Sequence, residues 1–292
     1  MLMMSSSMIK GETSMRKLIL LVVLSLISTH SFALDPKESR MELSGLNQIV
    51  DQTNFIVERV CSGTLIDLKN KLVLTNYHCI ESKVSVVDKE EISPNGQLKK
   101  FRAKKYVDVT IEQNGYNSFE KVSSAQYFAD IVAEDKTTDL AILKIKSDIP
   151  HKRASLILPE TLSIVRGETV YVVGNPGGLD ATIVKGIVSN LNRTFEFPWT
   201  DNTKLAMIQF SGGTYGGNSG GALYNDKGYL IGVPAAGVTQ AAFIGLAVPA
   251  EVVRTFMKKN CLSEAFDSKA NNQKCLEDKK KKEKDKASDS EK

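Results

Sequence analysis

The alternation of apolar and polar positions along the chain indicates many short β-strands. From residue 55 onward, short runs rich in Val, Ile and Leu are separated by polar turns such as Ser93-Pro-Asn-Gly96, a pattern typical of strands. The first set of runs covers residues 55–57, 63–66, 72–74, 84–87, 105–111, 123–132 and 140–145. The second set covers residues 169–173, 181–188, 205–210, 221–224, 229–233 and 241–248. Many short strands with turn signals between them predict an all-β barrel or sandwich.

A stretch with little pattern divides the two sets of strands. Residues 147–160 contain two prolines and no clear periodicity, so we expect two β-barrels of similar size, at about 56–147 and 161–250. Residues 251–257 predict a C-terminal helix. Residues 34–55 are expected to form a short N-terminal helical segment that packs on the barrels, because apolar residues recur there at roughly helical spacing. These residues are Met41, Leu43, Leu46, Ile49 and Val50.

The first 33 residues are typical of a secretory signal with an N-terminal extension. Met15-Arg-Lys17 is basic, residues 18–27 are apolar, and Ser31-Phe-Ala33 is a small-x-small cleavage site, as in signal peptides. We therefore expect a mature start near Leu34 and an exported protein, with Met15 as an alternative start codon. The other interpretation is an uncleaved membrane anchor, although the apolar run is short for a bilayer span.

The end of the chain is highly charged. From Lys269 onward there are nine lysines and six acidic residues, and Ala287 is the one apolar residue after Leu276. Such a segment cannot bury enough apolar surface to fold, so we expect residues 261–292 to be a disordered tail. Solubility is its expected role, and a weak electrostatic contact with anionic envelope surfaces is the alternative.

Charge and cysteine content narrow the choice of partners. The net charge is +4 and most of it lies in the tail, so nothing predicts a nucleic-acid partner. All four cysteines follow the signal, and an even number in an exported chain favours disulfides, with three pairings open. The competing interpretation is a metal site formed by Cys61, His78 and Cys79, but adjacent His and Cys are poor ligand spacing. We expect no metal and no cofactor.

The candidate chemistry centres on the run GGTYGGNSGG at residues 212–221. Glycines permit tight turns and close approach, so Ser219 is expected at an exposed turn where backbone N–H groups can converge into an oxyanion hole. A phosphate loop would need Lys after its last glycine, whereas here Asn218 and Ser219 follow Gly217. A flexible surface loop is the remaining alternative. A nucleophilic serine needs a base. His30 lies in the signal and His151 in a polar connection expected to be solvated, which leaves His78, at the end of an apolar run.

Four motifs together resemble the trypsin-like (chymotrypsin-fold) serine proteases over about residues 56–258. They are CSGTLI at 61–66, LTNYHC at 74–79, TDLAIL at 138–143 and GNSGG at 217–221. The order His, Asp, Ser is that of this family and not of subtilisins or α/β-hydrolases. Three further motifs are most similar to the bacterial HtrA/Deg-type branch: GNPGGL at 174–179, KGIVS at 185–189 and GLAVPA at 245–250. The resemblance implies two six-stranded antiparallel β-barrels with a C-terminal helix. We expect no PDZ domain, for which the chain leaves no room.

The resemblance also implies a set of site residues. Ser219 would attack a peptide carbonyl, His78 would take its proton, and Asp139 would hold the imidazole. The N–H groups of Gly217 and Ser219 would form the oxyanion hole. Among the cysteines, the resemblance selects the pair Cys61–Cys79 and leaves Cys261–Cys275 as the second disulfide.

The sequence departs from the family at positions that set specificity. Asn218 stands where digestive enzymes have Asp, so we expect no zymogen switch. Gly213 stands where trypsin has the acid that binds basic side chains. With Val233, Pro234 and Ala235 as the implied pocket wall, a small or medium apolar residue is the expected preference. Tyr215-Gly216 replaces the Asn-Pro usual in HtrA relatives, so the loop is expected to differ in shape.

The leading hypothesis is an exported, periplasmic or secreted serine endopeptidase that cleaves proteins or peptides through an acyl-enzyme. A catalytically idle binding or chaperone-like module on the same fold is the main alternative. A serine esterase is the third. The sequence carries no signal for an oligomeric state.

Overall fold

The computed structural model describes residues 43–92, 97–116, 121–200, 203–238, 241–267 and 269–289. The expected signal segment and its extension, residues 1–33, lie outside these ranges. Within the described part of the chain, no helix combines the length and the apolar character needed to cross a bilayer.

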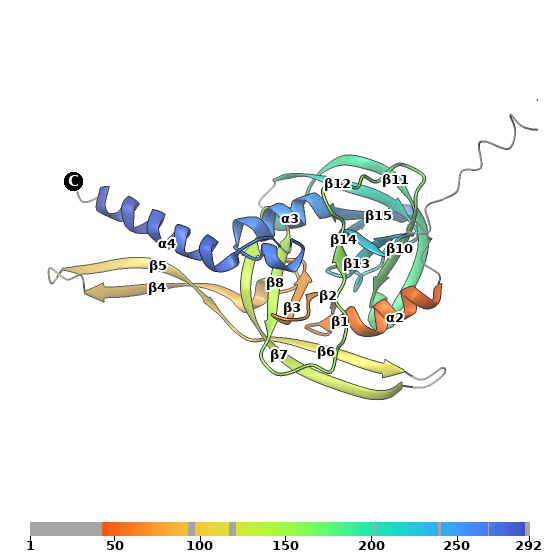
Figure 1. The fold of residues 1–292 in the computed structure, drawn as a ribbon, viewed down its shortest axis with the longest axis horizontal. Helices are drawn as coiled ribbons and strands as arrows, with labels where there is room; N and C mark the ends of the chain where they lie inside the picture. Colours follow the sequence, from red (N-terminus) through yellow and green to blue (C-terminus); the bar gives the residue numbers. More distant parts are fainter. Residues whose placement is uncertain are drawn as a thin grey trace, which may run out of the picture. The chain divides into compact units, whose positions relative to one another are not determined.

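The first barrel is a closed ring of six strands in the order β1-β2-β3-β8-β7-β6 (Figure 1). Its strands are β1 (Asn54–Val57), β2 (Cys61–Asp67), β3 (Leu72–Thr75), β6 (Val109–Tyr116), β7 (Lys121–Asp135) and β8 (Leu140–Ile145). Branched and aromatic side chains fill its interior, with Phe55, Leu65, Val73 and Leu143 fully buried. β2 and β3 are buried along their whole length. β3 therefore appears in the sequence as an apolar run, whereas β2 also buries the polar residues Ser62, Thr64 and Asp67.

The second barrel is also closed by antiparallel pairing. Its strands are β10 (Thr169–Gly174), β11 (Thr182–Glu196), β12 (Lys204–Ser211), β13 (Ala222–Asn225), β14 (Tyr229–Val238) and β15 (Ala241–Pro249). They follow the order β13-β10-β11-β12-β15-β14, and the pairing of β13 with β14 completes the ring. The short strand β9 (Leu156–Ile157) adds to β14 in parallel. The expected fold of two six-stranded antiparallel barrels is therefore confirmed.

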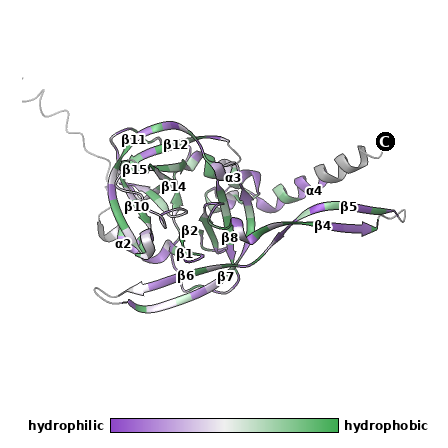
Figure 2. Ribbon diagram, turned by 180° about the vertical axis from the view of Figure 1, so that it is seen from behind, coloured by the Kyte–Doolittle hydropathy of each residue, from purple (hydrophilic) through white to green (hydrophobic). Residues whose placement is uncertain are grey.

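One part of the strand prediction is wrong. β4 (Val84–Ile92) and β5 (Leu98–Tyr106) pair only with each other in the described structure, as a hairpin outside both barrels (Figure 1). The expected single strand at 105–111 is divided, because β5 ends at Tyr106 and β6 begins at Val109. Hydrophilic stretches interrupt hydrophobic ones along this hairpin (Figure 2). Cross-strand charges support it, as in the ion pair of Lys100 with Glu90 at 2.7 Å, since opposite charges on facing strands stabilise a pair.

Two helices pack on the barrels. α2 (Leu43–Thr53) buries Leu46 and Val50 in a core cluster that contains residues of both barrels. α3 (Ala250–Lys259) buries Val253, Phe256 and Met257 in the same cluster, which agrees with the expected C-terminal helix. Short 3-10 turns are η2 (Glu81–Lys83), η3 (Pro176–Gly178), η4 (Pro198–Thr200) and η5 (Ser263–Ala265).

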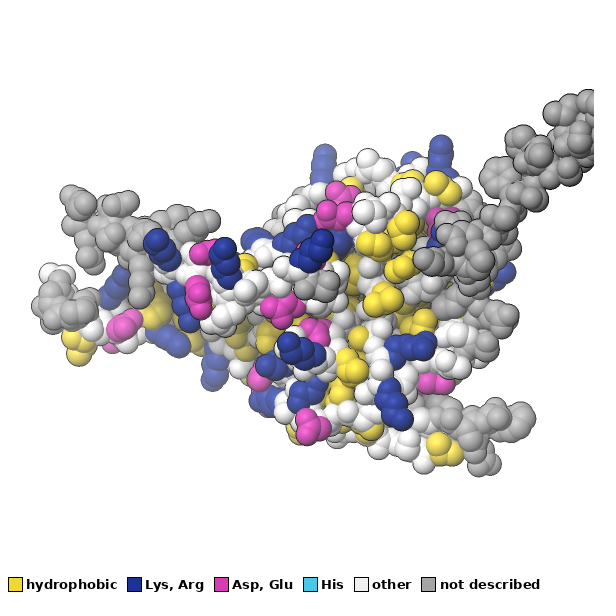
Figure 3. All heavy atoms as spheres, in the orientation of Figure 1, with side chains coloured by type: hydrophobic (Ala, Val, Ile, Leu, Met, Phe, Trp, Pro, Cys, Tyr) yellow, Lys and Arg dark blue, Asp and Glu magenta, His cyan; other side chains and the backbone are white. Residues whose placement is uncertain are grey.

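The segment after Cys261 differs from the expected disordered tail. Asn272–Asp289 forms the helix α4, and the Cys261–Cys275 disulfide joins its first turn to the end of α3. Lys, Glu and Ala are good helix formers, so the composition that prevents a hydrophobic core does not prevent a helix. On the face shown in Figure 3, Lys and Arg side chains lie next to Asp and Glu side chains. They are seen both over the barrels and toward the hairpin.

Candidate active site

His78 and Asp139 meet at the edge of the first barrel. His78 follows the end of β3 and Asp139 directly precedes β8, and these two strands are paired neighbours. The imidazole Nδ1 lies 2.8 Å from Asp139 Oδ2 and 3.1 Å from Oδ1. The backbone N–H of His78 also donates to Oδ1, at 3.0 Å. The Asp139 side chain is only 1% exposed whereas that of His78 is 23% exposed, so the carboxylate supports an imidazole that reaches solvent.

The backbone of Asp139 is held in an unusual conformation. Its φ of 54° lies in the left-handed region, which Asp tolerates better than most side chains. The buried amide of Asn76 donates from Nδ2 to the carbonyl oxygen of Asp139 at 2.8 Å. This contact fixes the turn before β8 and with it the direction of the carboxylate.

Ser219 lies in a loop that only glycines can build. A Cβ on Gly217 would lie 2.3 Å from the Asn175 carbonyl oxygen, and one on Gly220 would lie 2.2 Å from the Ser62 carbonyl oxygen. Both glycines also have positive φ, 108° and 82°. The Ser219 carbonyl accepts a hydrogen bond from the Ser62 N–H at 2.8 Å. The loop of the second barrel is thereby bound to β2 of the first.

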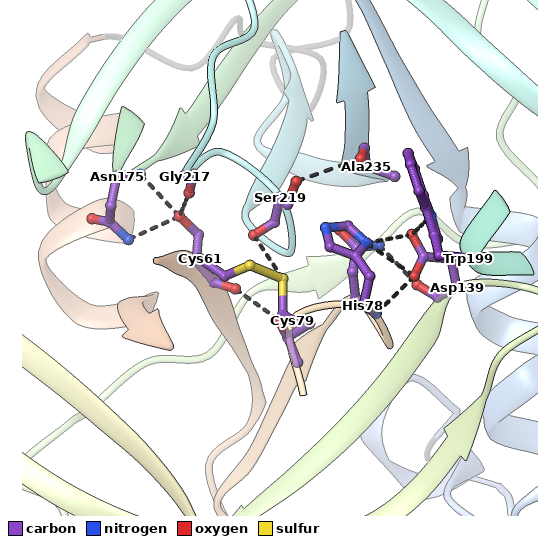
Figure 4. Close-up of a disulfide and its surroundings, with 12 residues drawn as sticks. Cys61, His78, Cys79, Asp139, Asn175, Trp199, Gly217, Ser219 and Ala235 are labelled. Carbon is purple, nitrogen blue, oxygen red and sulfur yellow. Dashed lines mark hydrogen bonds and ion pairs between the residues drawn. A yellow bond between two sulfur atoms is a disulfide. The ribbon is translucent and has the colours of Figure 1, made fainter. Parts of the chain in front are cut away.

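The side chain of Ser219 lies between the Cys61–Cys79 disulfide and the His78 imidazole (Figure 4). Its hydroxyl donates to the Ala235 carbonyl oxygen at 3.4 Å. Within the described residues, the N–H groups of Gly217 and Ser219 donate to no protein acceptor. They are the two N–H groups that the resemblance assigns to the oxyanion hole.

Sequence reasoning missed Asn175, which binds the two barrels together beside the site. Its Nδ2 donates to the Phe55 carbonyl at 2.9 Å and to Ser62 Oγ at 2.8 Å, and Ser62 Oγ in turn donates to the Gly217 carbonyl at 2.6 Å. Its Oδ1 accepts from Asn54 Nδ2 and from the Ala181 N–H. The GNPGGL motif contains this residue, but a loop asparagine in a sequence gives no sign of four side-chain partners in two barrels.

Trp199 was also missed. Its indole Nε1 donates to Asp139 Oδ2 at 3.2 Å, and its ring centroid lies 5.4 Å from that of His78. Trp199 is the one tryptophan of the chain, but this fact alone does not predict a contact with Asp139.

Both disulfides that were expected are present, Cys61–Cys79 and Cys261–Cys275. Cys61, His78 and Cys79 lie close enough together for a metal ion. However, the two sulfurs are bonded to each other and offer no thiolate, so this group does not fit a zinc site.

The residues expected to form the specificity pocket have different environments. Val233 is fully buried in the core of the second barrel, and the Pro234 carbonyl accepts from the Gly220 N–H. The Ala235 carbonyl faces the Ser219 hydroxyl. Gly213 has a φ of 72° and is followed by Thr214, a residue that sequence reasoning did not single out. A Cβ on Gly245 would lie 2.1 Å from Thr214 Oγ1, so Thr214 packs closely on β15.

Comparisons with known proteins agree with this geometry. The trypsin-like peptidase domain family matches residues 61–233. The serine protease HTRA1A of Danio rerio is 34% identical over 148 residues, which are 51% of this chain and 29% of that protein. A serine protease HtrA-like protein of Staphylococcus aureus is 33% identical over 137 residues, 44% of this chain and 18% of that protein. This chain thus spans less than a third of the length of these relatives.

A solved structure supports the fold. The serine endoprotease from Yersinia pestis superposes with a TM-score of 0.51 and 23% identity, covering 73% of this chain and 65% of that one. The family match extends over more than half of the chain and contains β2, His78, Asp139 and Ser219. The chain belongs to the trypsin-like peptidase family, and its relatives are HtrA-type serine proteases.

Proposed function

We propose that this protein is a serine endopeptidase with His78, Asp139 and Ser219 as its catalytic triad. The observation that carries the proposal is the buried Asp139 carboxylate bonded to the partly exposed His78 imidazole, with Ser219 beside that ring (Figure 4). Three residues far apart in the sequence supply a nucleophile, a base and a group that orients the base.

In the proposed reaction, Ser219 Oγ attacks the carbonyl carbon of a bound peptide while His78 Nε2 takes the hydroxyl proton. Asp139 holds Nδ1–H and stabilises the imidazolium. The N–H groups of Gly217 and Ser219, which have no acceptor in the described structure, stabilise the oxyanion. His78 then gives its proton to the leaving amine. In the second half of the reaction, His78 takes a proton from water, the water oxygen attacks the acyl carbon, and Ser219 Oγ leaves with the proton that His78 returns.

The substrate is proposed to be a protein or peptide with a small or medium apolar residue before the cut. Gly213 places no negative charge beside the serine loop, so basic side chains find no partner there. Thr214 packs closely on Gly245 of β15, which favours a small or medium side chain beside the loop. Tyr215-Gly216 gives the outer part of the loop an exposed aromatic side chain.

We propose that the protein acts outside the cytoplasm, in the periplasm or after secretion. Two disulfides favour an oxidising compartment, and both are formed between residues that follow the expected signal. The N-terminal signal pattern supports the same location.

The test is cleavage of unfolded casein by the purified protein, with Ser219→Ala as the matched variant. Cleavage by the wild type alone would support both the peptidase function and the nucleophile. The idle binding module is the second candidate, because the Ser219 hydroxyl is bonded to Ala235 and not to His78 among the described residues. No cleavage together with no labelling of Ser219 by a fluorophosphonate would favour that module.

A further inference from the structure

The Asp139 carboxylate has a hydrogen-bond donor beyond those that His78 supplies. The His78 backbone N–H and Nδ1 provide two donors, and the Trp199 indole provides the third, at 3.2 Å to Oδ2. The carboxylate is 1% exposed and therefore has almost no access to water. A buried charge needs protein donors, and hydrogen bonds to ionised groups are about twice as strong as neutral ones.

The indole reaches the carboxylate from the other barrel. Trp199 belongs to η4, between β11 and β12, whereas His78 and Asp139 lie on the first barrel. Its ring stacks on Phe197, with centroids 4.8 Å apart and planes at 17°, and Phe197 stacks on Phe195 of β11. The next residue, Thr200, is fully buried, and its hydroxyl donates to the Phe197 carbonyl at 2.9 Å. The ring is thus held in place by its own loop.

We propose that Trp199 is a positioning residue, whose indole N–H fixes the plane of the Asp139 carboxylate so that Oδ2 stays directed at His78 Nδ1. This inference rests on the proposed function of the triad. The indole N–H and His78 Nδ1 share Oδ2, so a rotation of the carboxylate would break the indole contact and leave the imidazole only its longer contact with Oδ1. The second barrel would thereby supply the nucleophile, Ser219, and also hold the Asp139 carboxylate of the first barrel in position. The competing role for Trp199 is simple packing of its ring beside His78.

The first test separates the N–H from the ring. Trp199→Phe keeps an aromatic ring in the stack and removes the donor, whereas Trp199→Leu removes both. The rate constant for labelling by a fluorophosphonate should fall about 10-fold in Trp199→Phe, the effect of a hydrogen bond to a charged group, and Trp199→Leu should lose little more. The KM for a peptide should change by less than about twofold, because an orienting role acts on turnover.

The control is Tyr106→Phe, which also removes a donor to a carboxylate, at 3.5 Å, but from Tyr106 of β5 to Glu134 of β7 and not to Asp139. Its labelling rate should equal that of the wild type. A Trp199→Phe protein that labels as fast as the wild type, with the loss confined to Trp199→Leu, would assign the residue to packing and overturn the proposal.

The second test needs no activity. The chain has one tryptophan, so its NMR spectrum contains a single indole N–H resonance, which Trp199→Phe identifies by its loss. Asp139→Asn should move this resonance upfield because the amide is a weaker acceptor, and Asp88→Asn on the hairpin should leave it in place. If Asp139→Asn does not fold, His78→Ala serves, since removing the competing donor should move the resonance downfield.

An indole resonance that responds to neither change would overturn the contact itself. The outcomes also separate this proposal from the proposed function. Absence of any labelling in the wild type would refute the peptidase and the catalytic purpose of Trp199, while the indole shift would still establish the bond to Asp139. Labelling of the wild type with no effect in Trp199→Phe would refute the positioning role alone.

Discussion

Replacement of Asn175 by Ala should destabilise the whole protein, because this side chain joins the two barrels. It is 3% exposed and takes part in four side-chain hydrogen bonds, to Phe55 O, Ser62 Oγ, Asn54 Nδ2 and the Ala181 N–H. Among the described residues, Asn54 Oδ1 is already buried without a hydrogen-bond partner, and the loss of Asn175 would remove the partner of Asn54 Nδ2 as well.

The magnitude follows from the number of bonds. Each intramolecular hydrogen bond contributes about 1 kcal/mol net, and a buried group left without a partner costs about 1–3 kcal/mol. We expect Asn175→Ala to lower the free energy of unfolding by about 4 kcal/mol. For a domain of this size, about 2–4 °C of Tm is lost per kcal/mol, so the Tm should fall by about 8–16 °C.

The assay is thermal unfolding followed by circular dichroism, with Asn192→Ala as the matched control. Asn192 is exposed on β11, so its replacement should change stability by less than about 0.5 kcal/mol. Fluorophosphonate labelling below the Tm should also slow, because Ser62, which loses the hydrogen bond from Asn175 Nδ2, holds the Gly217 carbonyl. A Tm within about 3 °C of the wild type would refute the view that Asn175 holds the barrels together.

Three further changes test other parts of the account. Gly220→Ala should abolish Ser219 labelling, since its Cβ would meet the Ser62 carbonyl oxygen at 2.2 Å at a φ of 82°; a labelling rate near that of the wild type would contradict this. Replacing both Cys61 and Cys79 by Ala should lower stability by about 3 kcal/mol in denaturant titrations, the entropy of a loop of that length, and an unchanged midpoint would count against it. Burial lowers the pKa of His151 in the folded protein. The folded state therefore binds a proton at His151 less readily than the unfolded state does. Stability should therefore be retained above pH of about 6.5 and fall below it, and His151→Gln should reduce that slope in unfolding measured from pH 7 to 5.

The elements that could be predicted from the sequence are those with a local signal. The runs at residues 72–74 and 140–145 became β3 and β8 because nearly every side chain in them is buried, and such runs stand out from polar turns. The glycines around Ser219 were informative because the space at Gly217 and Gly220 excludes any side chain. The order of the motifs was enough to predict the family, and the family in turn predicted the fold and both disulfides.

The features that the sequence did not indicate depend on partners far away in the chain. Trp199 meets Asp139 across 60 positions, and Asn175 meets Ser62 across 113. His151, expected to be solvated, is 9% exposed and contacts Gln113, since the linker around it packs on β1 and β6. β4 begins with the β-branched run of a barrel strand, at residues 84–87. Its place outside the barrel is seen only from the ring of strands that closes without it.

The most direct test of the central claim is mass spectrometry of the protein after reaction with a fluorophosphonate. We predict one adduct, on Ser219, which is absent in Ser219→Ala and forms much more slowly in His78→Ala and Asp139→Asn. An adduct on another serine, or a rate that does not depend on His78, would contradict the assignment of the triad.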